Sequence, residues 1–342
     1  MLGTAVACPD KFRGTLDAAA AAAAMARGLR RAGYEDVREL PLADGGEGTL
    51  EVIATLRGGS SRVTRVTGPL GDPVEAEWAV LPDGTAIVEM ARASGRALVD
   101  RDRRDALEAS TRGTGELIAA AIRSGADRIV VGVGGSATTD GGLAAVQALD
   151  WSLGGVEVVV ACDVRTQFLD AASVFGPQKG ATAAQVGLLS RRLEQLASVY
   201  RDRTGTDVTG LEGGGAAGGL AGGLAAIGAR IEPGFDVVAD IVGLEPLLET
   251  ANLVVTGEGR LDATSFLGKV VGGVVELATE LGVPHVGVIA GQVTDDARAA
   301  SSAFGDVTVL ALTDRVWQAG EAFSRAAILV EEAALEIARG GT

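Results

Sequence analysis

The chain has 342 residues and a formal net charge of -15 at pH 7, which disfavours nucleic acid and anionic membranes as partners because both repel an acidic protein. Its 47% hydrophobic content is enough for two domains with sizeable cores, and 50 glycines beside only 4% aromatic residues favour α/β layers with tight turns. Two cysteines and one histidine are too few for a disulfide framework or a zinc site. The sequence shows neither the apolar core of a signal peptide nor an apolar run of membrane-spanning length, so we expect a cytoplasmic protein.

The first 60 residues predict two strand–turn–helix units. An apolar strand over residues 4–8 leads into the loop PDKFRG, and Thr15 is expected to begin an alanine-rich helix that ends at Gly33. A second strand over residues 37–42 leads into the acidic turn ADGGEGT, residues 43–49, and a further helix begins at Leu50. Both units therefore place an aspartate in the loop that follows the strand.

The sequence pattern changes near residue 61. Apolar and polar residues alternate over the next three segments, with Gly-Asp-Pro and Pro-Asp-Gly turns between them, which is typical of an antiparallel meander. The stretch 128–143, RIVVGVGGSATTDGGL, then predicts a buried strand, a glycine-rich turn and the start of a helix. A strand that ends at Asp163 and the loop FGPQKG, residues 175–180, precede a long amphipathic helix.

The glycine-rich turn of residues 134–142 is a candidate anion site. Backbone N–H groups at a helix N-terminus, together with the helix dipole, suit a phosphate or a carboxylate. Asp140 would then lie close to a bound phosphate, where a metal ion usually mediates the contact. The alternative is a tight turn whose glycines only permit close packing, and the turn alone does not decide between the two.

Residues 250–342 return to alternating strands and helices. One strand ends at Glu258, the next contains His285, a third lies near residue 310, and the closing helix spans residues 321–339. This spacing is typical of a parallel doubly wound sheet. We therefore predict one domain of residues 1–62 plus 250–342, with a second, mixed α/β domain of residues 63–249 inserted into it.

Charged residues that suit phosphate chemistry follow the predicted strands. The acidic ones are Asp10, Asp44, Asp140, Asp163, Glu258 and Asp262. In an open parallel sheet a ligand binds outside the carboxyl ends of the strands, where these side chains gather. Of the 30 basic residues only three are lysines, and Lys11, Lys179 and Lys269 all lie in short loops close to glycine or proline. Phosphoryl transfer needs such cations together with Mg²⁺ and a carboxylate base.

Two nucleotide-binding fingerprints separate the candidate functions. The segment LGKV, residues 267–270, lacks the first glycine and the Ser/Thr of a P-loop, so a P-loop NTPase is excluded. Residues 132–137, GVGGSA, match G-x-G-x-x-A after a strand, with Asp150 as the nearest suitable acid, which keeps an NAD-dependent oxidoreductase as an alternative. A non-catalytic sugar-acid binding module is a third interpretation, although it makes poor use of so many acidic turns.

Taken together, the motifs resemble those of the bacterial glycerate kinase family. They follow in family order across nearly the whole chain: PDKFRG, LADGGEGT, EMARASG, STRGTGELI, VGVGGSATTDGG, VACDV, FGPQKGA, GAAGGL and VVTGEGRLD. The resemblance implies ATP and Mg²⁺ as cofactors and D-glycerate as substrate, commonly giving 2-phosphoglycerate, with a related small hydroxy acid as the alternative acceptor. It also implies two α/β domains with the active site in the cleft, one a flavodoxin-like parallel doubly wound sheet and the other mixed α/β.

The resemblance also suggests roles for individual residues. Asp163 is our choice of general base, since one histidine leaves a carboxylate as the natural candidate, and Lys179 and Lys11 would neutralise the transferred phosphoryl group. Mg²⁺ would be held, directly or through water, by Asp44, Asp140 and Glu258. Substrate and phosphate binding is expected from the other motif residues: Asp10, Gly45, Gly46, Glu47, Gly48, Arg112, Gly134, Gly135, Ser136, Thr138, Gln178, Arg260 and Lys269. Of these, Arg112 or Arg260 would grip the glycerate carboxylate as a fork.

The chain departs from the family pattern in three places. Between residues 149 and 156 the family usually carries a longer segment, and only DWSLGG remains here. After VACDV, residues 165–168 (RTQF) replace the family's DNPL, and Arg13 stands where many members have lysine. The first two changes lie close to Asp163 and leave the acceptor open. The phosphorylated hydroxyl, the loop that binds each substrate and the formation of a homo-oligomer also stay open.

Overall fold

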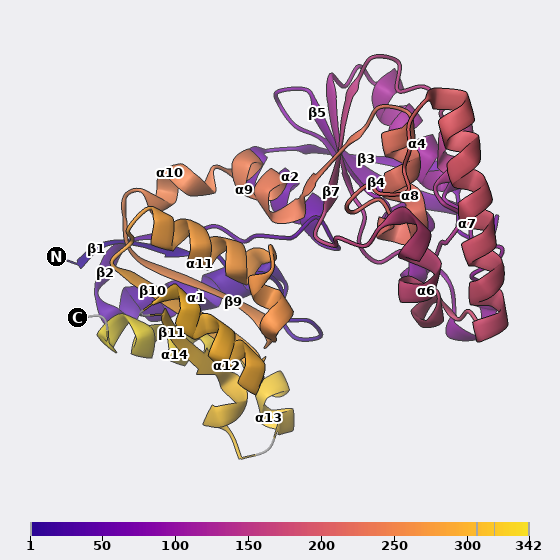
Figure 1. Ribbon diagram of the computed structural model, residues 1–342. Helices are drawn as coiled ribbons and strands as arrows, with labels where there is room; N and C mark the ends of the chain where they lie inside the picture. The colour runs from indigo at the N-terminus through magenta and orange to yellow at the C-terminus, as the bar shows by residue number, and fades with distance from the viewer. Residues whose placement is uncertain (1, 306, 318, 341–342) are drawn as a thin grey trace. The chain divides into compact units, whose positions relative to one another are not determined.

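The computed structural model describes residues 2–305, 307–317 and 319–340, which fold into two compact units (Figure 1). The first unit comprises Met1–Asp44 with Phe235–Thr342, and the second comprises Gly45–Gly234. The units divide at 44/45 and 234/235 rather than at the expected 62/63 and 249/250. Strand β3 (Ser60–Thr67) explains the first difference, because it pairs along its whole length with β4 (Pro73–Val80) of the second unit.

The first unit is built on a five-stranded parallel sheet. Its order is β11 (Val307–Ala311), β10 (His285–Val293), β9 (Ala251–Leu261), β1 (Leu2–Ala7) and β2 (Tyr34–Glu39). Renumbered within the unit this is 2-1-3-4-5, the order of flavodoxin-like folds, so the predicted doubly wound sheet is confirmed. In such a fold, ligands bind outside the carboxyl ends of the strands.

The helices of the first unit pack around this sheet. They are α1 (Ala18–Ala32), α9 (Gly234–Val242), α10 (Leu244–Leu248), α11 (Val270–Glu280), α12 (Asp295–Ser301), α13 (Ala319–Ser324) and α14 (Ala326–Gly340). Helix α1 begins after Asp17, whose side chain accepts a hydrogen bond from the Ala20 N–H, rather than at the expected Thr15. Gly33 ends the helix in the left-handed region at φ 106°, as predicted.

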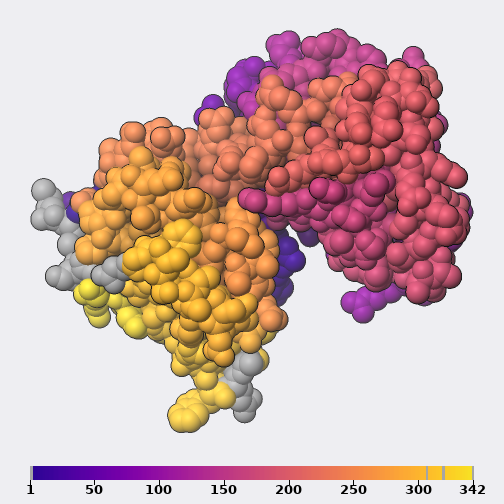
Figure 2. Space-filling model, in the orientation of Figure 1, coloured from indigo at the N-terminus to yellow at the C-terminus, as the bar shows by residue number. Residues whose placement is uncertain are grey.

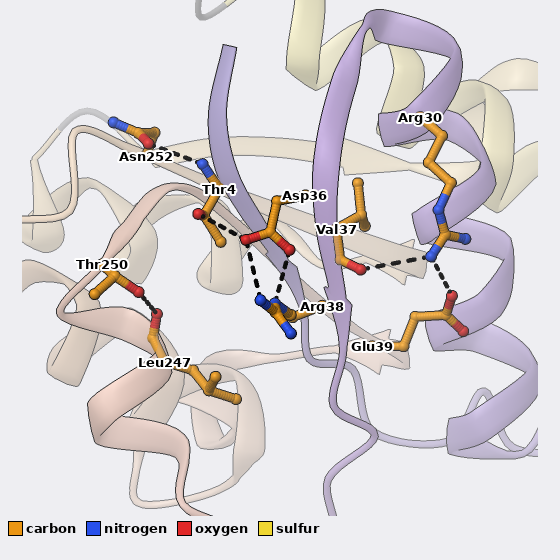
Figure 3. Close-up of polar contacts among 9 residues, drawn as sticks. All are labelled: Thr4, Arg30, Asp36, Val37, Arg38, Glu39, Leu247, Thr250 and Asn252. Atoms are coloured by element: carbon orange, nitrogen blue, oxygen red, sulfur yellow. Dashed lines mark hydrogen bonds and ion pairs between the residues drawn. The ribbon is translucent and has the colours of Figure 1, made fainter. Parts of the chain in front are cut away.

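Charged side chains on the β1–β2 side of the first unit are arranged as pairs (Figure 3). The Asp36 carboxylate accepts from the Thr4 hydroxyl at 3.1 Å and pairs with Arg38 at 2.7 Å. Arg30 of α1 pairs with Glu39 at 2.9 Å. These groups are exposed enough to be hydrated, so each pair contributes little to stability.

The second unit is built on a six-stranded mixed sheet. Its order is β3, β4, β5 (Thr85–Glu89), β6 (Arg128–Gly132), β7 (Glu157–Cys162) and β8 (Arg230–Pro233). The β3–β4 and β4–β5 pairs are antiparallel, which confirms the predicted meander, and the remaining pairs are parallel. The parallel strands β5, β6 and β7 are almost fully buried, as expected for strands covered on both faces.

The helices of the second unit are α2 (Thr49–Arg57), α3 (Ala91–Ser94), α4 (Arg112–Arg123), α5 (Leu143–Ala148), α6 (Ala171–Phe175), α7 (Ala183–Thr204) and α8 (Ala216–Ala226). Helix α7 runs along the surface of the second unit (Figure 2). It is amphipathic, since Leu189, Leu193, Leu196 and Tyr200 are buried while its charged side chains are exposed. The described part of the chain has no helix that is both long and apolar enough to cross a membrane.

Candidate active site

Three acidic residues lie at the carboxyl ends of the first unit's strands, and we call them the acidic edge: Asp10, Asp44 and Glu258. Asp10 and Asp44 follow β1 and β2, and Glu258 lies within β9. The Asp10 N–H donates to the Gly257 carbonyl at 2.9 Å, which holds the loop after β1 beside β9. Asp10 and Asp44 are each only 8% exposed. The first unit therefore buries negative charge where the fold places its ligands.

Burial disfavours the ionised form of these carboxyl groups. It raises the pKa of Asp10 to about 6, and the Asp44 charge adds to this, while the Lys11 ammonium 3.6 Å away opposes it. Burial raises the pKa of Glu258 to about 7, with a further contribution from Asp10. The Glu258 Oε1 atom is buried and has no hydrogen-bond partner among the described residues. Carboxylates that repel one another around an unsatisfied oxygen favour the binding of a cation.

Two lysines accompany the acidic edge. The Lys11 N–H donates to Asp10 Oδ1 at 2.7 Å, so the loop after β1 carries its ammonium beside the acid. Lys269 caps α11, its Nζ donates to Thr264 Oγ1 at 3.1 Å, and its charge lowers the pKa of Glu258 and of Asp262. A lysine at a helix N-terminus suits a phosphate group. Arg260 lies two residues beyond Glu258 on β9 and is exposed.

The acidic edge can be tested against the needs of Mg²⁺. Among residues 2–305, 307–317 and 319–340, no three His, Cys, Asp or Glu side chains form a metal-binding group. Mg²⁺ bound with a nucleotide needs only one or two carboxylates, because water and phosphate oxygens complete the octahedron. Asp10 and Glu258 meet that requirement. Asp140, the third expected metal residue beside Asp44 and Glu258, belongs to the second unit.

Glycines of the second unit permit very close packing between its loops. A Cβ on Gly134 would lie 2.6 Å from Gly46 Cα, and one on Gly132 would lie 2.7 Å from the Gly45 carbonyl oxygen. A Cβ on Gly142 would lie 2.9 Å from Leu220 Cα. Real side chains do not approach so closely, so these positions must be glycine for packing reasons alone. The packing alternative for the glycine-rich turn therefore accounts for much of its composition.

Asp140 and Thr138 of the glycine-rich turn form side-chain hydrogen bonds within the second unit. Asp140 is partly buried and accepts at Oδ2 from both the N–H and the hydroxyl of Thr111, each at 2.8 Å. Burial raises its pKa, and these bonds oppose the shift. The Thr138 hydroxyl donates to the Ala217 carbonyl at 3.2 Å, and Ser136 is 9% exposed. Asp140 thus ties the turn to α4.

The turn ADGGEGT is held by a carboxylate that sequence reasoning missed. Glu89, at the end of β5, is 1% exposed, and its Oε1 accepts from the N–H groups of Gly48 and Leu50, each at 2.9 Å. A carboxylate of the protein itself thus occupies the N-terminus of α2, where Gly48 was expected to bind phosphate. Gly45, Gly46 and Glu47 lie in the loop before this helix. The sequence signals for Glu89 were its place at the end of an otherwise apolar strand and at the start of the motif EMARASG, residues 89–95.

Lys179 is the most deeply buried cation of the predicted set. It is 3% exposed, and its Nζ donates to the Thr138 carbonyl at 2.5 Å. Burial lowers the pKa of Lys179 to about 7, with Asp140 opposing and Arg96 adding to the shift. The neighbouring Gln178 is exposed, and its Oε1 accepts from Arg96 at 3.3 Å.

Asp163 and Arg112 complete the predicted set in the second unit. Asp163 directly follows β7, at the carboxyl edge of the sheet, and its charge contributes to the raised pKa of the buried Cys162 thiol. Arg112 begins α4 and pairs with Glu116 at 2.9 Å on the exposed surface. Glu116 in turn accepts from the Thr67 N–H at 2.7 Å, so this arginine joins a link between α4 and β3.

The oxidoreductase alternative depends on Asp150. This residue lies in the turn after α5, exposed and at φ 50°, rather than at a strand end. A dinucleotide fold needs its ribose-binding acid at the end of the second strand. The match of residues 132–137 to G-x-G-x-x-A therefore lacks the ribose-binding acid that a dinucleotide site requires, and the oxidoreductase alternative is not supported.

Known proteins of one family match nearly the whole chain. The family model described as "Glycerate kinase family" matches residues 5–154 and 149–340. A Bacillus subtilis (strain 168) protein named glycerate kinase is 38% identical, over 97% of this chain and 96% of its own length. An Escherichia coli (strain K12) protein named glycerate 2-kinase is 38% identical, over 85% of this chain and 86% of its own.

A solved structure extends the comparison to the fold. The crystal structure of a Salmonella typhimurium LT2 protein, provisionally assigned as glycerate kinase 2, matches with a TM-score of 0.83 and 33% identity, covering 99% of this chain and 98% of that one. Fold, site and matches together define a phosphotransferase that acts on an alcohol group. The chain belongs to the glycerate kinase family. The two stretches of the family match meet at residues 149–154, the segment that is short in this sequence.

Proposed function

We propose that the protein transfers the γ-phosphoryl group of ATP to the 2-hydroxyl group of D-glycerate, giving 2-phosphoglycerate. The observation that carries the proposal is the acidic edge. Burial raises the pKa values of two of its carboxyl groups, the Glu258 Oε1 atom lacks a hydrogen-bond partner among the described residues, and Lys11 lies beside Asp10. The choice of the 2-hydroxyl is supported by the E. coli relative named glycerate 2-kinase. The reaction would take place in the cytoplasm, where ATP is available.

Asp10 and Glu258 are the residues that would hold Mg²⁺ at the acidic edge, with Asp44 acting directly or through water. Bound Mg²⁺ supplies charge neutralisation at the phosphate oxygens of ATP. The raised pKa values of Asp10 and Glu258 support this assignment, because a divalent cation would stabilise their ionised forms. Asp140 is less suited, since its Oδ2 already accepts two hydrogen bonds from Thr111.

The phosphate groups would be bound by cations of the first unit. Lys11 lies on the loop after β1, and Lys269 caps α11, so both present an ammonium group near the acidic edge. Arg260 follows on β9 and is exposed to a ligand. Most of the catalytic effect in phosphoryl transfer comes from such positioning and charge stabilisation. Asp10 would contribute through Lys11, whose backbone and ammonium it orients.

Asp163 remains our candidate for the general base that accepts the proton of the substrate hydroxyl. It directly follows β7, at the carboxyl edge of the second unit's sheet. The glycine-rich turn, with Gly135 and Ser136, would contribute backbone contacts to the substrate. At Gly135 a ligand has room, since the nearest atom to a Cβ there is Ala91 Cβ at 3.5 Å.

The acceptor could also be a related small hydroxy acid, because two departures from the family pattern flank Asp163. In one of them the connection from α5 to β7 is a tight turn, with Asp150 at φ 50° and Trp151 at φ 60°. The Trp151 ring packs against Tyr200, at 5.8 Å between ring centroids, and against the Arg203 guanidinium at 4.0 Å. The short segment is therefore part of the folded core of the second unit.

The proposal is tested by ATP turnover with a panel of small hydroxy acids and by identification of the product with phosphorus NMR. D-Glycerate is expected to give the highest kcat/KM, with a doublet from coupling to the single proton on C2. A triplet from coupling to the two C3 protons would place the phosphate on the 3-hydroxyl. No turnover of ATP with any acid of the panel would exclude the proposal.

A further inference from the structure

A small pocket of the second unit gathers three basic side chains from three separate segments, and we call it the basic pocket: Arg96, Arg104 and Lys179. Arg96 follows α3, Arg104 lies in the loop before α4, and Lys179 lies in the 3₁₀ turn Pro177–Lys179. Ala137 of the glycine-rich turn and Val99 also line it. In a chain with net charge -15, such a concentration of positive charge is a local feature.

Arg104 carries the strongest sign of a missing partner. Its Nε atom is buried and has no hydrogen-bond partner among the described residues. Its Nη2 atom reaches the Arg96 carbonyl at the long distance of 3.5 Å. Because a buried guanidinium N–H without an acceptor is costly, an acceptor from a bound molecule would satisfy it. Arginine presents Nε and Nη as a planar fork that matches a carboxylate or phosphate.

The other charges of the pocket leave an excess of positive charge. Lys179 and Arg96 are near enough that the arginine lowers the lysine pKa. Two carboxylates are close, but both are engaged by the protein. Asp105 Oδ1 accepts from the Leu107 and Glu108 N–H groups at 2.9 and 3.3 Å, and Asp140 accepts from Thr111. A small anion is therefore the ligand that the pocket would bind.

The size of the pocket selects among anions. Its empty space of about 200 Å³ includes open solvent, and the enclosed part has room for little more than a water-sized group. A nucleotide does not fit in the enclosed part, so only a charged end group of a ligand would enter it, with the rest of the ligand at the open mouth. The apolar side chains of Val99 and Leu70 line the wall beside the cations. They would exclude water from the ion pair and strengthen it.

We infer that the basic pocket binds the carboxylate of the acceptor, a small 2-hydroxy acid, through the guanidinium of Arg104 and the ammonium of Lys179. The inference rests on the proposed function for the identity of that acid. It assigns a substrate contact to Arg104, and to Arg96 a contribution to the positive charge of the pocket, which no motif had indicated. It also gives Lys179 the substrate carboxylate as its partner rather than the transferred phosphoryl group.

Calorimetric titration of D-glycerate into the full-length protein tests the inference. Arg104→Leu is expected to raise the Kd for D-glycerate about 10- to 100-fold, because a charge-assisted bond is lost, and to leave the Kd for ATP unchanged. Arg104→Lys, which keeps the charge and loses the fork, is expected to raise it several-fold. The matched control is Arg103→Leu, next in the chain, whose guanidinium is exposed and pairs with Asp72 at 3.1 Å. This control is expected to change neither Kd.

The ligand can be varied as well as the protein. D-Glyceramide has the hydroxyl groups of glycerate but no charge, and it is expected to bind the wild type about as weakly as it binds Arg104→Leu. If Arg104→Leu does not fold, Arg96→Leu and Arg104→Lys carry the same test, since the Arg96 side chain is half-exposed. An unchanged Kd for D-glycerate in all these variants would overturn the inference.

Two further outcomes separate the inference from the proposed function. An Arg104→Leu variant with weakened ATP binding and normal D-glycerate binding would assign the pocket to phosphate and overturn the carboxylate assignment. Tight binding of D-glycerate that depends on Arg104, without phosphorylation of it, would support the pocket and exclude the function. Normal phosphorylation of D-glycerate with unchanged KM in Arg104→Leu would support the function and exclude the pocket.

Discussion

The acidic edge of the first unit and the basic pocket of the second both hold buried charged atoms, negative in the first and positive in the second. Each buries polar atoms of charged groups, and in each one such atom has no hydrogen-bond partner within the part of the chain that the structure describes: Glu258 Oε1 in one and Arg104 Nε in the other. The surface carboxylates of β2 differ from both sites, because Asp36 and Glu39 each have an arginine beside them (Figure 3). Burial without a partner is costly to folding, so the two sites point to ligands of opposite charge.

Loss of a carboxylate from the acidic edge is expected to have the largest effect. Glu258→Gln should lower kcat about 10²- to 10³-fold and raise the Mg²⁺ concentration that gives half-maximal turnover, since a charged metal ligand is lost. Turnover measured across a Mg²⁺ titration checks this. Asp36→Asn is the control, because it removes an exposed carboxylate of the same unit that pairs with Arg38. Normal kcat in Glu258→Gln would place the metal elsewhere.

The basic pocket should respond to pH through Lys179. Burial lowers the pKa of Lys179 to about 7 in the free protein, with Arg96 adding to this and Asp140 opposing it. An anion favours the protonated lysine, so binding above pH 7 requires proton uptake, and the Kd for D-glycerate should rise up to about tenfold per pH unit. Titrations between pH 6 and 9, in two buffers of different ionisation enthalpy, count the protons taken up.

The variant Lys179→Met provides the control for that pH dependence. It should bind D-glycerate about 10-fold more weakly at pH 7 and lose the slope above pH 7, because a charge-assisted bond is absent and no lysine remains to titrate. Arg103→Leu should keep the slope of the wild type. Binding at pH 8 without proton uptake in the wild-type protein would show that Lys179 is already charged or is remote from the ligand.

Strand and helix patterns were sufficient to predict the fold, because hydrophobic periodicity depends on neighbours in sequence. The alternation after residue 61 predicted the meander β3–β5, and the tail predicted the parallel sheet. The boundary between the two units at Gly45 could not be predicted from such local patterns. It depends on the packing of Gly46 against Gly134, a contact between residues 88 positions apart that no local pattern reports.

Site residues were predictable only where a motif carried them. Asp10 and Glu258 lie in the family motifs PDKFRG and VVTGEGRLD, and in the structure the Asp10 charge acts on Glu258. Arg104 lies in the charged stretch RDRRD, which looked like ordinary surface, since its burial depends on the chain around Gly180. Asp44 and Asp140 occupy similar acidic glycine turns, but Asp140 accepts a tertiary hydrogen bond from Thr111, which the sequence does not indicate.

Substitution of Gly134 should lower the free energy of unfolding more than substitution of the neighbouring Gly135. A Cβ on Gly134 would lie 2.6 Å from Gly46 Cα, so Gly134→Ala should cost about 2–4 kcal/mol of unfolding free energy. Gly135 lies at φ 72° with its nearest contact at 3.5 Å, so Gly135→Ala should cost only about 1–2 kcal/mol. Urea unfolding of both variants measures the difference. Equal costs would mean that the turn can shift away from Gly46.

The smallest expected effect is a pH dependence of stability in the Mg²⁺-free protein. The pKa of Glu258 is about 7 when folded and near its ordinary 4.5 when unfolded, so the folded state holds more protons between these values. The contribution of Glu258 to the free energy of unfolding is fully present below pH 4.5 and is lost as the pH rises through 7. Glu258→Gln, which cannot ionise, should therefore exceed the wild type in stability at pH 8 by on the order of 1–2 kcal/mol, and the advantage should disappear near pH 4.5. Urea midpoints in EDTA measure it, with Asp36→Asn as the control. A variant that is less stable than the wild type at pH 8 would mean that the Glu258 carboxylate is already stabilised by the protein, and that the acidic edge does not need a cation.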